Sequence, residues 1–462
     1  MDKTIEVGMK VNTKSKNAVK DAVLLMDTYS KDSQKLHTSF KITGKNIPAV
    51  VIDDDGFLPE DVTSVYGYFL GEFAVSDRVP GKPRYFNQIT VPEYWEISGN
   101  NSSGKIHDLN KERGRIFYAE PKHKRLVKVV DWCDERGIVR VSDHYNKYGA
   151  LYARTTFNAK GHKVNKSYFS ATGAEIIVEN FVTKDIILND GDIVRIFHSK
   201  VEFVKFFMEQ AGYVDKRIFF NTLSTSFFVT QALPAVHKDD VLFWQEPIGD
   251  AVPGNMRVIL NDNANRVSKI KVQQRTAYKK LRKFGVAKDY ISKLGYVYPF
   301  SKMNNHKPEV LICTNSDRIA CLTELVEALP ELHFNVAAIT EMSSKLMSMS
   351  RYDNISLYPS VKPDILDELF DKCDYYLDIN YESEIASAVE QAFLHSHLII
   401  AFDETLHNAN YVASEQIYRT SELDKMIEML KSVLDNQDMM NECLEKQYDY
   451  AMLESVETYE NI

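Results

Sequence analysis

β-branched and aromatic residues, broken at regular intervals by polar turns, dominate the chain over 66–189. Four of these turns end in glycines that stand twelve residues apart, at Gly137, Gly149, Gly161 and Gly173. In each, a short polar residue stands three positions before the glycine, as in a type I turn that ends in a left-handed residue. Four evenly spaced reversals predict five antiparallel strands in a meander.

A different rhythm, in which apolar runs alternate with amphipathic segments, flanks this meander on both sides. Apolar residues at helical spacing predict a helix over 18–37, and the run at 48–53 predicts a buried strand. Further strands separated by helices are predicted after the meander, at 193–197, 217–221, 241–246 and 270–273. The meander is therefore expected to be an insertion in an α/β domain.

The same alternation starts again after the linker-like stretch 301–308. Five short apolar runs with helices between them predict the strands of a doubly wound parallel sheet, at 310–315, 334–339, 355–359, 375–379 and 398–402. In such a sheet, ligands bind at the carboxyl ends of the strands. Acidic amphipathic sequence over 421–459 predicts closing helices.

These patterns divide the chain into four segments. The predicted boundaries give the first part of one Rossmann-like domain, the inserted extended β-sheet domain, the rest of the first domain, and a second Rossmann-like domain with C-terminal helices, over 1–60, 61–190, 191–300 and 301–462. The predicted fold class is thus α/β, a pair of Rossmann domains with an antiparallel insertion.

Composition narrows the class of protein. The 462 residues are 44% hydrophobic, enough for several packed cores. We expect a cytoplasmic protein, because no run of eighteen apolar residues and no signal-like apolar stretch near the start is present. The five cysteines show no close pairing, so we expect neither disulfides nor a metal site, and nothing predicts a cofactor.

Charge is distributed unevenly along the chain. Residues 121–170 carry eleven Lys and Arg against four Asp and Glu, whereas residues 362–462 carry six against twenty-three. Two interpretations stay open, partner-binding surfaces of opposite sign and ordinary solvated faces. Nucleic acid is not expected as a partner, because the whole chain has a net charge of −9 and carries no RNA-binding signature.

Extending the register from the four turns places a set of basic and aromatic residues on one face of the meander. In this register Tyr152 lies opposite Tyr168, and Arg154 lies opposite Lys166. The face is a candidate surface for docking a partner, with a solvated face as the alternative, and comprises Trp132, Arg140, His144, Tyr152, Arg154, Lys166 and Tyr168.

Glu382 and Glu390 are the candidates for sugar-transfer chemistry. Two-domain retaining glycosyltransferases use such a pair on the donor sugar and the nucleotide ribose, with glycines that let backbone amides approach the diphosphate. Here no glycine follows Gly295, and Arg318 is the lone cation after the first strand of the second domain. We therefore predict no catalytic residues. The alternative is an active retaining glycosyltransferase that uses a UDP-sugar and these two glutamates.

Polar residues that follow predicted strands are candidates for binding an acceptor. They lie at carboxyl edges of the sheets and carry groups that suit sugars or a Ser/Thr-rich peptide, although caps and turns explain several of them equally well. These candidates are Trp244, Gln245, Asn255, Asn315, Glu341, Asn380, Glu384, Asp403, His407 and Asn408.

Several long strings in the sequence are specific to one protein family. They read G-F-L-P-E-D-V, K-P-R-Y-F-N-Q-I, W-E-I-S-G-N-N-S-S-G-K-I, H-K-R-L-V-K-V-V-D-W, L-F-W-Q-E-P-I, V-P-G-N-M, L-T-E-L-V-E-A-L-P-E-L-H-F and T-E-M-S-S-K-L-M. From about Leu24 onward the chain resembles the glycosyltransferase-stabilising (chaperone) subunits, of GtfB type, of the accessory Sec system that O-glycosylates serine-rich repeat adhesins. Residues 1–20 lie outside the resemblance, as an extension.

The resemblance implies a non-catalytic, GT-B-like pseudo-glycosyltransferase. Such a subunit would pair with a catalytic subunit that transfers N-acetylglucosamine from UDP-N-acetylglucosamine to Ser or Thr. It would stabilise that subunit and bind the adhesin polypeptide. The resemblance also implies a heterotetramer, peripheral to the cytoplasmic face of the cell membrane.

Overall fold

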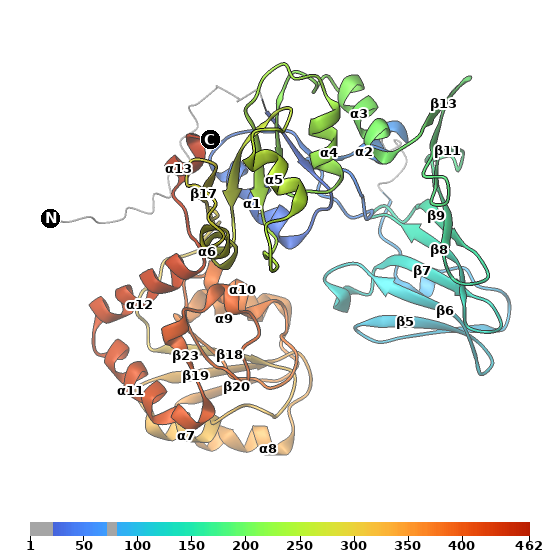
Figure 1. The fold of residues 1–462 in the computed structure, drawn as a ribbon. Helices are drawn as coiled ribbons and strands as arrows, with labels where there is room; N and C mark the ends of the chain where they lie inside the picture. The colour runs from blue at the N-terminus through green and yellow to red at the C-terminus, as the bar shows by residue number, and fades with distance from the viewer. Residues whose placement is uncertain (1–21, 72–80) are drawn as a thin grey trace. The chain divides into compact units, whose positions relative to one another are not determined.

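The computed structural model describes residues 22–71 and 81–462, which form two compact units divided between Leu294 and Gly295 (Figure 1). The first unit holds a parallel sheet and an antiparallel sheet, and the second holds one parallel sheet. The predicted extension over 1–20 lies outside the described residues.

The first parallel sheet has seven strands in the order β17-β16-β15-β14-β1-β2-β3. Its strands are β1 (Ala22–Met26), β2 (Ala49–Val51), β3 (Val62–Ser64), β14 (Arg217–Phe220), β15 (Asp240–Trp244), β16 (Val267–Val272) and β17 (Ile291–Lys293). Its helices are α1 (Lys31–Ile42), α2 (Val65–Phe69), α3 (Lys200–Gln210), α4 (Thr225–Ala232), α5 (Gly254–Leu260) and α6 (Arg275–Lys283). From β1 the chain adds strands β2 and β3 on one side and strands β14 to β17 on the other. The carboxyl ends of β1 and β14, where the two directions meet, are the topological switch point of the sheet.

The helix predicted over 18–37 is wrong for residues 22–30 and confirmed for residues 31–37. Residues 22–26 form β1, all five of them buried in the middle of the sheet, and α1 begins only at Lys31, where the Ser30 hydroxyl caps it. A short run that is apolar on both faces suits a buried parallel strand as well as a buried helix, so its periodicity does not distinguish the two.

The antiparallel sheet has ten strands in sequence order from β4 to β13. They are β4 (Trp95–Gly99), β5 (Ser103–Asp108), β6 (Lys111–Tyr118), β7 (Val127–Cys133), β8 (Val139–Tyr145), β9 (Leu151–Phe157), β10 (Lys163–Phe169), β11 (Glu175–Asn180), β12 (Ile186–Asp190) and β13 (Ile193–Phe197). The five predicted strands are β7 to β11, and each of the four turn glycines has a φ between 76° and 84°. The predicted meander is thus confirmed as part of a larger sheet.

The strand predicted at 193–197 exists, but it belongs to this sheet and not to the α/β domain. A turn at Gly191, with φ 61°, folds β13 back along β12, and Ile187 pairs with Ile196. The α/β domain resumes with α3. An apolar run alone does not say with which sheet it pairs.

The predicted register across the turns holds for the first two pairs of residues and is wrong beyond them. Each strand that follows a glycine turn carries one extra residue soon after the turn, so that Tyr168 pairs with Ala153 and Arg154 pairs with Ser167. The four extra residues are themselves twelve apart, at Arg140, Tyr152, Val164 and Ile176. A bulge of one residue moves every later side chain to the opposite face relative to a strict alternation.

One face of this sheet packs against the first α/β domain. The Tyr66 ring after β3 stacks on the Tyr168 ring of β10, with centroids 4.4 Å apart. The Lys200 ammonium at the start of α3 pairs with Glu179 of β11 at 3.2 Å and with Asp53 at 2.8 Å. An aromatic stack and a shared ion pair therefore join the inserted sheet to its host domain.

The second unit contains a six-stranded parallel sheet in the order β20-β19-β18-β21-β22-β23. Its strands are β18 (Glu309–Thr314), β19 (His333–Ala338), β20 (Ile355–Tyr358), β21 (Tyr375–Asp378), β22 (Leu398–Phe402) and β23 (Ile417–Tyr418). The five predicted strands and the doubly wound arrangement are confirmed, and the order reverses between β18 and β21.

Helices cover this second sheet and close the chain. They are α7 (Leu322–Ala328), α8 (Ser344–Met347), α9 (Pro363–Lys372), α10 (Ala388–Leu394), α11 (Leu423–Leu434), α12 (Gln437–Tyr450) and α13 (Val456–Glu460). Short 3₁₀ helices lie at Phe86–Gln88, Lys122–Lys124, Ser348–Arg351, Ala409–Tyr411, Ser414–Gln416 and Thr420–Glu422. Across the described ranges, no helix is both long enough and apolar enough to cross a bilayer.

Candidate functional site

The switch point of the second sheet is where a doubly wound domain binds its ligand. Arg318 follows β18 and Glu382 follows β21, and their side chains form an ion pair, with Nη1 and Oε1 2.8 Å apart. The Arg318 guanidinium also lies over the Tyr381 ring, 5.4 Å from its centroid. The Arg318 cation after β18 is therefore already paired with a carboxylate of the chain.

Helix α10 begins beside this pair and has its first turn occupied in the same way. The Glu384 carboxylate accepts a hydrogen bond from the Val389 amide at 3.0 Å. The loop reaches the helix through Ala386 and Ser387, which have φ values of 50° and 51°. A left-handed conformation costs a residue with a side chain about 1–2 kcal/mol, whereas glycine adopts it freely. Because Glu384 binds the Val389 amide, the amide end of α10, where an anion would bind, is occupied by a carboxylate of the chain.

His407 is held between two elements at the same switch point. Its Nδ1 lies 2.5 Å from Oδ1 of Asp378 at the end of β21, and its Nε2 lies 2.6 Å from the carbonyl oxygen of Glu382. The hydrogen bond to Asp378 raises the pKa of His407 to about 9, so the imidazole is protonated at neutral pH and both nitrogens donate. A protonated histidine with both donors engaged ties the loop to the strand and does not act as a base.

Glu390 on α10 is engaged by a buried side chain. The Tyr411 hydroxyl donates to Oε1 of Glu390 at 2.8 Å, and the Tyr411 ring is 1% exposed. Both glutamates of the alternative catalytic pair therefore have partners within the second unit, Glu382 with Arg318 and Glu390 with Tyr411.

The other candidates of the second unit divide into structural and open groups. Asn380 is buried, accepts from the Thr314 hydroxyl at 2.9 Å and donates to the Glu382 carbonyl at 3.0 Å, so it shapes the loop. Glu341 accepts from the Ser360 hydroxyl at 3.0 Å.

Three more candidates of this unit follow β18 and β22. Asn408 caps a 3₁₀ helix through its side chain, which accepts from the Asn410 amide. Among the described residues, the buried Oδ1 atom of Asn315 has no hydrogen-bond partner. Asp403 follows β22 and is exposed. Asn315 thus keeps a buried polar atom without a partner in the described residues, and Asp403 keeps an exposed carboxylate.

In the first unit Trp244 is the last residue of β15, Gln245 follows it, and Asn255 lies in the first turn of α5. Trp244 is 3% exposed and packs in the core, so its position at the end of a strand did not place it in a cleft. Gln245 accepts from the Asn221 amide at 2.8 Å and donates to the Gln273 side chain at 3.0 Å, both of them buried. Asn255 donates to the Leu223 carbonyl at 3.0 Å.

Sequence reasoning missed Asn221 and Asp27, which lie at the switch point of the first sheet. The Asp27 carboxylate accepts from the backbone amides of Thr225 and Ser226, at 3.1 and 2.9 Å, and thereby caps α4. The Asn221 side chain is buried, and its Oδ1 atom has no partner in the described part of the chain. The signal for Asn221 was its place at the end of the strand predicted at 217–221, whereas Asp27 fell inside the helix predicted over 18–37 and gave no signal.

The predicted docking face of the meander divides into two. Four of its members lie on the side that packs against the first α/β domain, and Tyr152 and Tyr168 are 4% and 3% exposed. The Lys166 ammonium lies 4.7 Å from the Tyr168 ring centroid, and His144 contacts the Thr155 hydroxyl at 2.9 Å. Burial lowers the pKa of Lys166 to about 8.

Trp132 and Arg154 lie on the opposite face, where both donate to Asp143, at 2.9 Å and 2.6 Å. Arg140 is one of the bulge residues and lies 4.0 Å from Asp134. The single face expected from the sequence does not form, because the bulge shifts the alternation by one residue in each hairpin.

The turn between β8 and β9 differs from its three counterparts by docking on the first α/β domain. The Lys147 amide donates to the Gly56 carbonyl at 2.8 Å, and its ammonium donates to the Leu58 carbonyl at 2.6 Å. A hollow of about 680 Å³ lies here, and Glu60 on its wall binds both Lys147 and Tyr148. Because the polar groups on its walls bind one another, the hollow is part of the contact between the inserted sheet and the first α/β domain.

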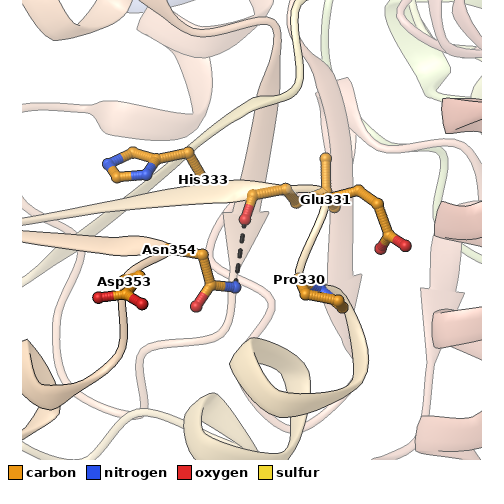
Figure 2. Close-up of a pocket in the computed structure, with 6 residues that line it drawn as sticks. Pro330, Glu331, His333, Asp353 and Asn354 are labelled. Carbon is orange, nitrogen blue, oxygen red and sulfur yellow. Dashed lines mark hydrogen bonds between the residues drawn. The ribbon is translucent and has the colours of Figure 1, made fainter.

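A smaller hollow of about 410 Å³ opens at the amino ends of β19 and β20 (Figure 2). Asn354 on its wall donates to the carbonyls of Val326 and Leu329 at the end of α7, at 3.0 and 3.2 Å, and to that of Leu332 before β19, at 3.3 Å. The walls also carry Glu331 and Asp353. The hollow lies at the strand ends opposite the switch point, and its amide holds the helix terminus.

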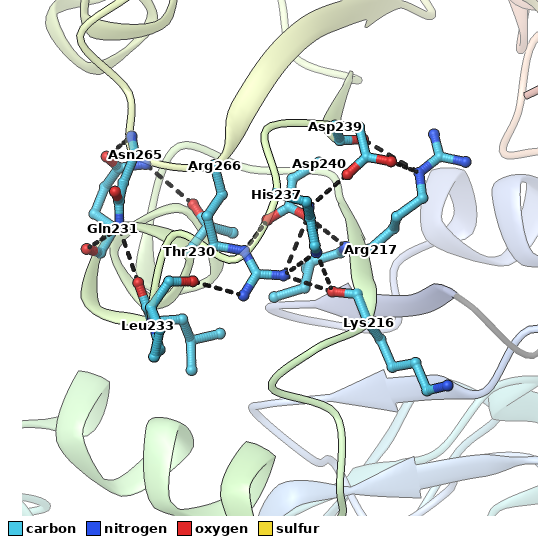
Figure 3. Close-up of polar contacts among 12 residues, drawn as sticks. Lys216, Arg217, Thr230, Gln231, Leu233, His237, Asp239, Asp240, Asn265 and Arg266 are labelled. Carbon is cyan, nitrogen blue, oxygen red and sulfur yellow. Dashed lines mark hydrogen bonds and ion pairs between the residues drawn. The ribbon is translucent and has the colours of Figure 1, made fainter.

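His237, Asp239 and Asp240 are close enough together to hold a metal ion (Figure 3). However, both carboxylates already bind arginines. Arg266, which is fully buried, lies 3.0 Å from Asp240, and Arg217 lies 3.0 Å from Asp239. Nη2 of Arg266 also lies 2.7 Å from Nε2 of His237. The arginine guanidinium groups bind the side chains that would otherwise hold a metal ion. The cluster therefore holds together the amino ends of the strands.

Family comparisons cover both units of the chain. Models of the GtfB N-terminal, middle and third domains match residues 23–69, 95–198 and 200–284, and the GftB/GlyA-F C-terminal domain matches 310–447. The UDP-N-acetylglucosamine–peptide N-acetylglucosaminyltransferase stabilizing protein GtfB of Streptococcus pneumoniae is 41% identical over 92% of this chain and 95% of its own length. The chain belongs to the GtfB family.

Other members of the GtfB family agree in sequence and in fold. GtfB of Streptococcus agalactiae is 40% identical over 95% of this chain and 98% of its own length. A chain in the crystal structure of a GtfA/B complex bound to UDP and GlcNAc is 39% identical, with a TM-score of 0.88 over 95% of this chain and 98% of that chain. The resemblance and the GT-B-like fold expected from the sequence are confirmed.

Proposed function

We propose that this chain is a non-catalytic subunit that stabilises a catalytic O-linked N-acetylglucosamine transferase and binds the Ser/Thr-rich acceptor of that enzyme. The observation that carries the proposal is the state of the switch point in the second unit. There the chain's own carboxylates occupy the groups that would meet a donor diphosphate, Glu382 at Arg318 and Glu384 at the Val389 amide. The names of the related stabilising proteins support the same role.

The physical reason is electrostatic. Transfer of a sugar from a UDP-sugar develops negative charge on the leaving diphosphate, which an active enzyme stabilises with cations and backbone amides. At this switch point a diphosphate would have to displace Glu382 and Glu384, and both carboxylates would repel it. A site of this kind disfavours the donor and leaves the chemistry to a partner.

The acceptor in this proposal is an unfolded adhesin polypeptide. A disordered chain offers backbone amides and hydroxyls, which hydrogen-bonding side chains at strand ends recognise without a deep pocket. Asn315 and Asp403 in the second unit are the candidate contacts that keep an accessible or unpartnered polar group. Asn221 adds a buried acceptor without a partner in the first unit.

The proposal also includes the assembly and its place in the cell. We infer a heterotetramer with a GtfA-type catalytic subunit, peripheral to the cytoplasmic face of the membrane, that serves an accessory Sec system and its serine-rich repeat adhesin. The relative in the GtfA/B crystal structure supports the pairing. The outer face of the ten-stranded sheet, with Trp132 and Arg154, is the part of the predicted docking face that remains outside the contact with the α/β domain.

A sugar-transfer assay with the purified chain tests the proposal. The chain alone, mixed with UDP-N-acetylglucosamine and a Ser-rich peptide, is expected to give no glycopeptide by mass spectrometry. Addition of the catalytic subunit is expected to give glycopeptide. Transfer by the chain alone, abolished by Glu390→Gln, would establish the alternative of an active retaining glycosyltransferase.

A further inference from the structure

Strand β13 is a free edge of the ten-stranded sheet and carries apolar residues that nothing in the described chain covers. In the sheet it pairs on one side, with β12. Ile193, Val194 and Ile196 are 52%, 62% and 58% exposed. A free strand edge exposes a row of backbone donors and acceptors, and proteins usually protect such an edge with charges, proline or a covering segment.

The exposed apolar residues continue inward from the edge on the outer face. Ile196 pairs with Ile187 of β12, and Ile187 pairs with Val178 of β11. Val178 and Ile187 are half-buried. We call Val178, Ile187, Val194 and Ile196 the edge patch. An apolar patch that runs up to an unpaired edge is typical of a surface that becomes buried in an assembly.

The inner face of β13 packs on α3 near the end of the strand, at Phe197, whereas Ile193 at its start is exposed. The Phe197 ring lies 5.4 Å from the Phe203 ring and 5.2 Å from the Phe206 ring, both on α3. The Arg195 guanidinium lies over the Phe206 ring at 5.2 Å. Strand β13 is therefore fixed in place by α3, and a rigid edge is a better template for an added strand than a frayed one.

The opposite edge of the same sheet lacks this character. In β4 the apolar side chains of Trp95 and Ile97 pack against the core cluster below the sheet, and Glu96 stands between them. The contrast indicates that the exposed apolar edge is a property of β13 and not of the sheet's ends in general.

We propose that β13 is the edge to which the catalytic partner adds a strand, so that the sheet continues from this chain into the partner. This inference rests on the proposed function. The partner strand is expected to be apolar on its outward face, against Val194 and Ile196, and to place an acidic residue opposite Arg195.

Charge disfavours a second copy of this chain as the occupant. An antiparallel pairing of two β13 strands that matches Val194 with Ile196 of the other copy places Arg195 opposite Arg195. Like charges directly opposite one another across two strands are destabilising. A different chain with a carboxylate at that position removes the repulsion.

Hydrogen exchange tests the added strand directly. In the purified complex with the catalytic subunit, the backbone amides over 193–197 are expected to exchange at least tenfold more slowly than in the chain alone. The amides of β4 are the internal control and are expected to keep their rates. Unchanged exchange over 193–197 in a formed complex would overturn the inference.

A matched pair of variants gives a second test. Ile196→Glu places a charge in the edge patch, and Val236→Glu places one at a residue that is 53% exposed on the first α/β domain. Binding of the catalytic subunit is expected to weaken at least tenfold for the first and less than twofold for the second, with equal melting temperatures for both free proteins. Equal binding by the two variants would overturn the inference.

The outcomes separate the two proposals. If the unaltered chain binds no catalytic subunit, the proposed function fails. If it binds and Ile196→Glu binds equally well, the proposed function survives and the inference about β13 fails. A free chain that light scattering shows to be dimeric, and that Ile196→Glu turns into a monomer, would assign the edge to a second copy and overturn the choice of partner.

Discussion

At the residue scale, the second switch point is held together by charges that neutralise one another. His407 binds Asp378 and the Glu382 carbonyl, Glu382 binds Arg318, and Glu384 holds the first turn of α10. The first contacts tie the loop of His407 to strand β21 and to the loop after it, the second joins the loops after β18 and β21, and the third lies within the loop that leads into α10. Together they keep a loop with left-handed Ala386 and Ser387 in one conformation.

The protonation of His407 predicts how the second unit depends on pH. Its pKa is raised from 6.5 to about 9 in the folded chain, so its contribution to stability is complete below pH 6.5 and is lost as the pH rises through about 9. The contribution is at most about 3 kcal/mol, at about 1.4 kcal/mol for each pKa unit. We expect the difference in melting temperature between the unaltered chain and His407→Gln to shrink over this range.

The variant is needed as a reference because Lys166 titrates in the same range with the opposite sign. Burial lowers the pKa of Lys166 to about 8, so its charged form destabilises the fold. This destabilisation is relieved, and the protein gains stability, as the pH rises above about 8. The comparison with His407→Gln cancels this effect. A melting difference that stays constant from pH 6 to pH 10 would contradict the assignment of a raised pKa to His407.

Arg266 makes the strongest stability prediction among single residues. It is fully buried and pairs with Asp240 while it donates to the carbonyls of Val214 and Lys216. Arg266→Met leaves the Asp240 carboxylate buried without its cation, which costs about 3–5 kcal/mol. The exposed Lys238→Met, which loses a surface ion pair and a hydrogen bond with Asp262, is the control and is expected to cost less than about 1 kcal/mol in urea unfolding.

At the scale of elements, the glycine turns of the meander share a conformation but not a role. Gly137 and Gly149 have nearly the same φ, 76° and 77°. A Cβ atom on Gly137 meets nothing within 4 Å, whereas one on Gly149 lies 2.4 Å from the Lys82 carbonyl oxygen. The turn that contains Gly149 also docks on the loop around Gly56.

Alanine substitutions of these two glycines are therefore expected to differ. Both variants take on the cost of a left-handed alanine, about 1 kcal/mol, and Gly149→Ala alone adds a clash with backbone. We expect Gly149→Ala to lower the free energy of unfolding by at least about 1 kcal/mol more than Gly137→Ala in urea titrations. Equal losses would show that the backbone at Lys82 moves away from the new Cβ atom without cost.

The same turns mark what the sequence could and could not predict about this sheet. The position of each reversal followed from a polar residue and a glycine within four residues, which is a local rule. The bulges at Arg140, Tyr152, Val164 and Ile176 depend on how two strands twist against each other, and no local residue type announces them. The turns were therefore predicted correctly and the faces were not.

At the scale of the whole molecule, the fold was predictable because its signals repeat. The second sheet alternates strands and helices in the order that the doubly wound pattern requires, and five strands were predicted at their places. In the first unit, β1 was taken for a helix because a buried strand has no alternation.

The candidate site was predictable in position and not in detail. Residues after parallel strands do gather at the switch points, but the position of a residue does not fix the direction of its side chain. Trp244 ends β15 and is buried in the core. The pairing of Arg318 with Glu382 joins residues 64 positions apart, which a single sequence does not reveal.

The central claim is that the donor position of the second unit is filled by the chain's own groups. Calorimetric titration of the purified chain with UDP tests it most directly. We predict no saturable binding up to millimolar UDP, because Glu382 and Glu384 hold the cation and the amide that a diphosphate would need. Saturable binding that Arg318→Ala abolishes would contradict the claim.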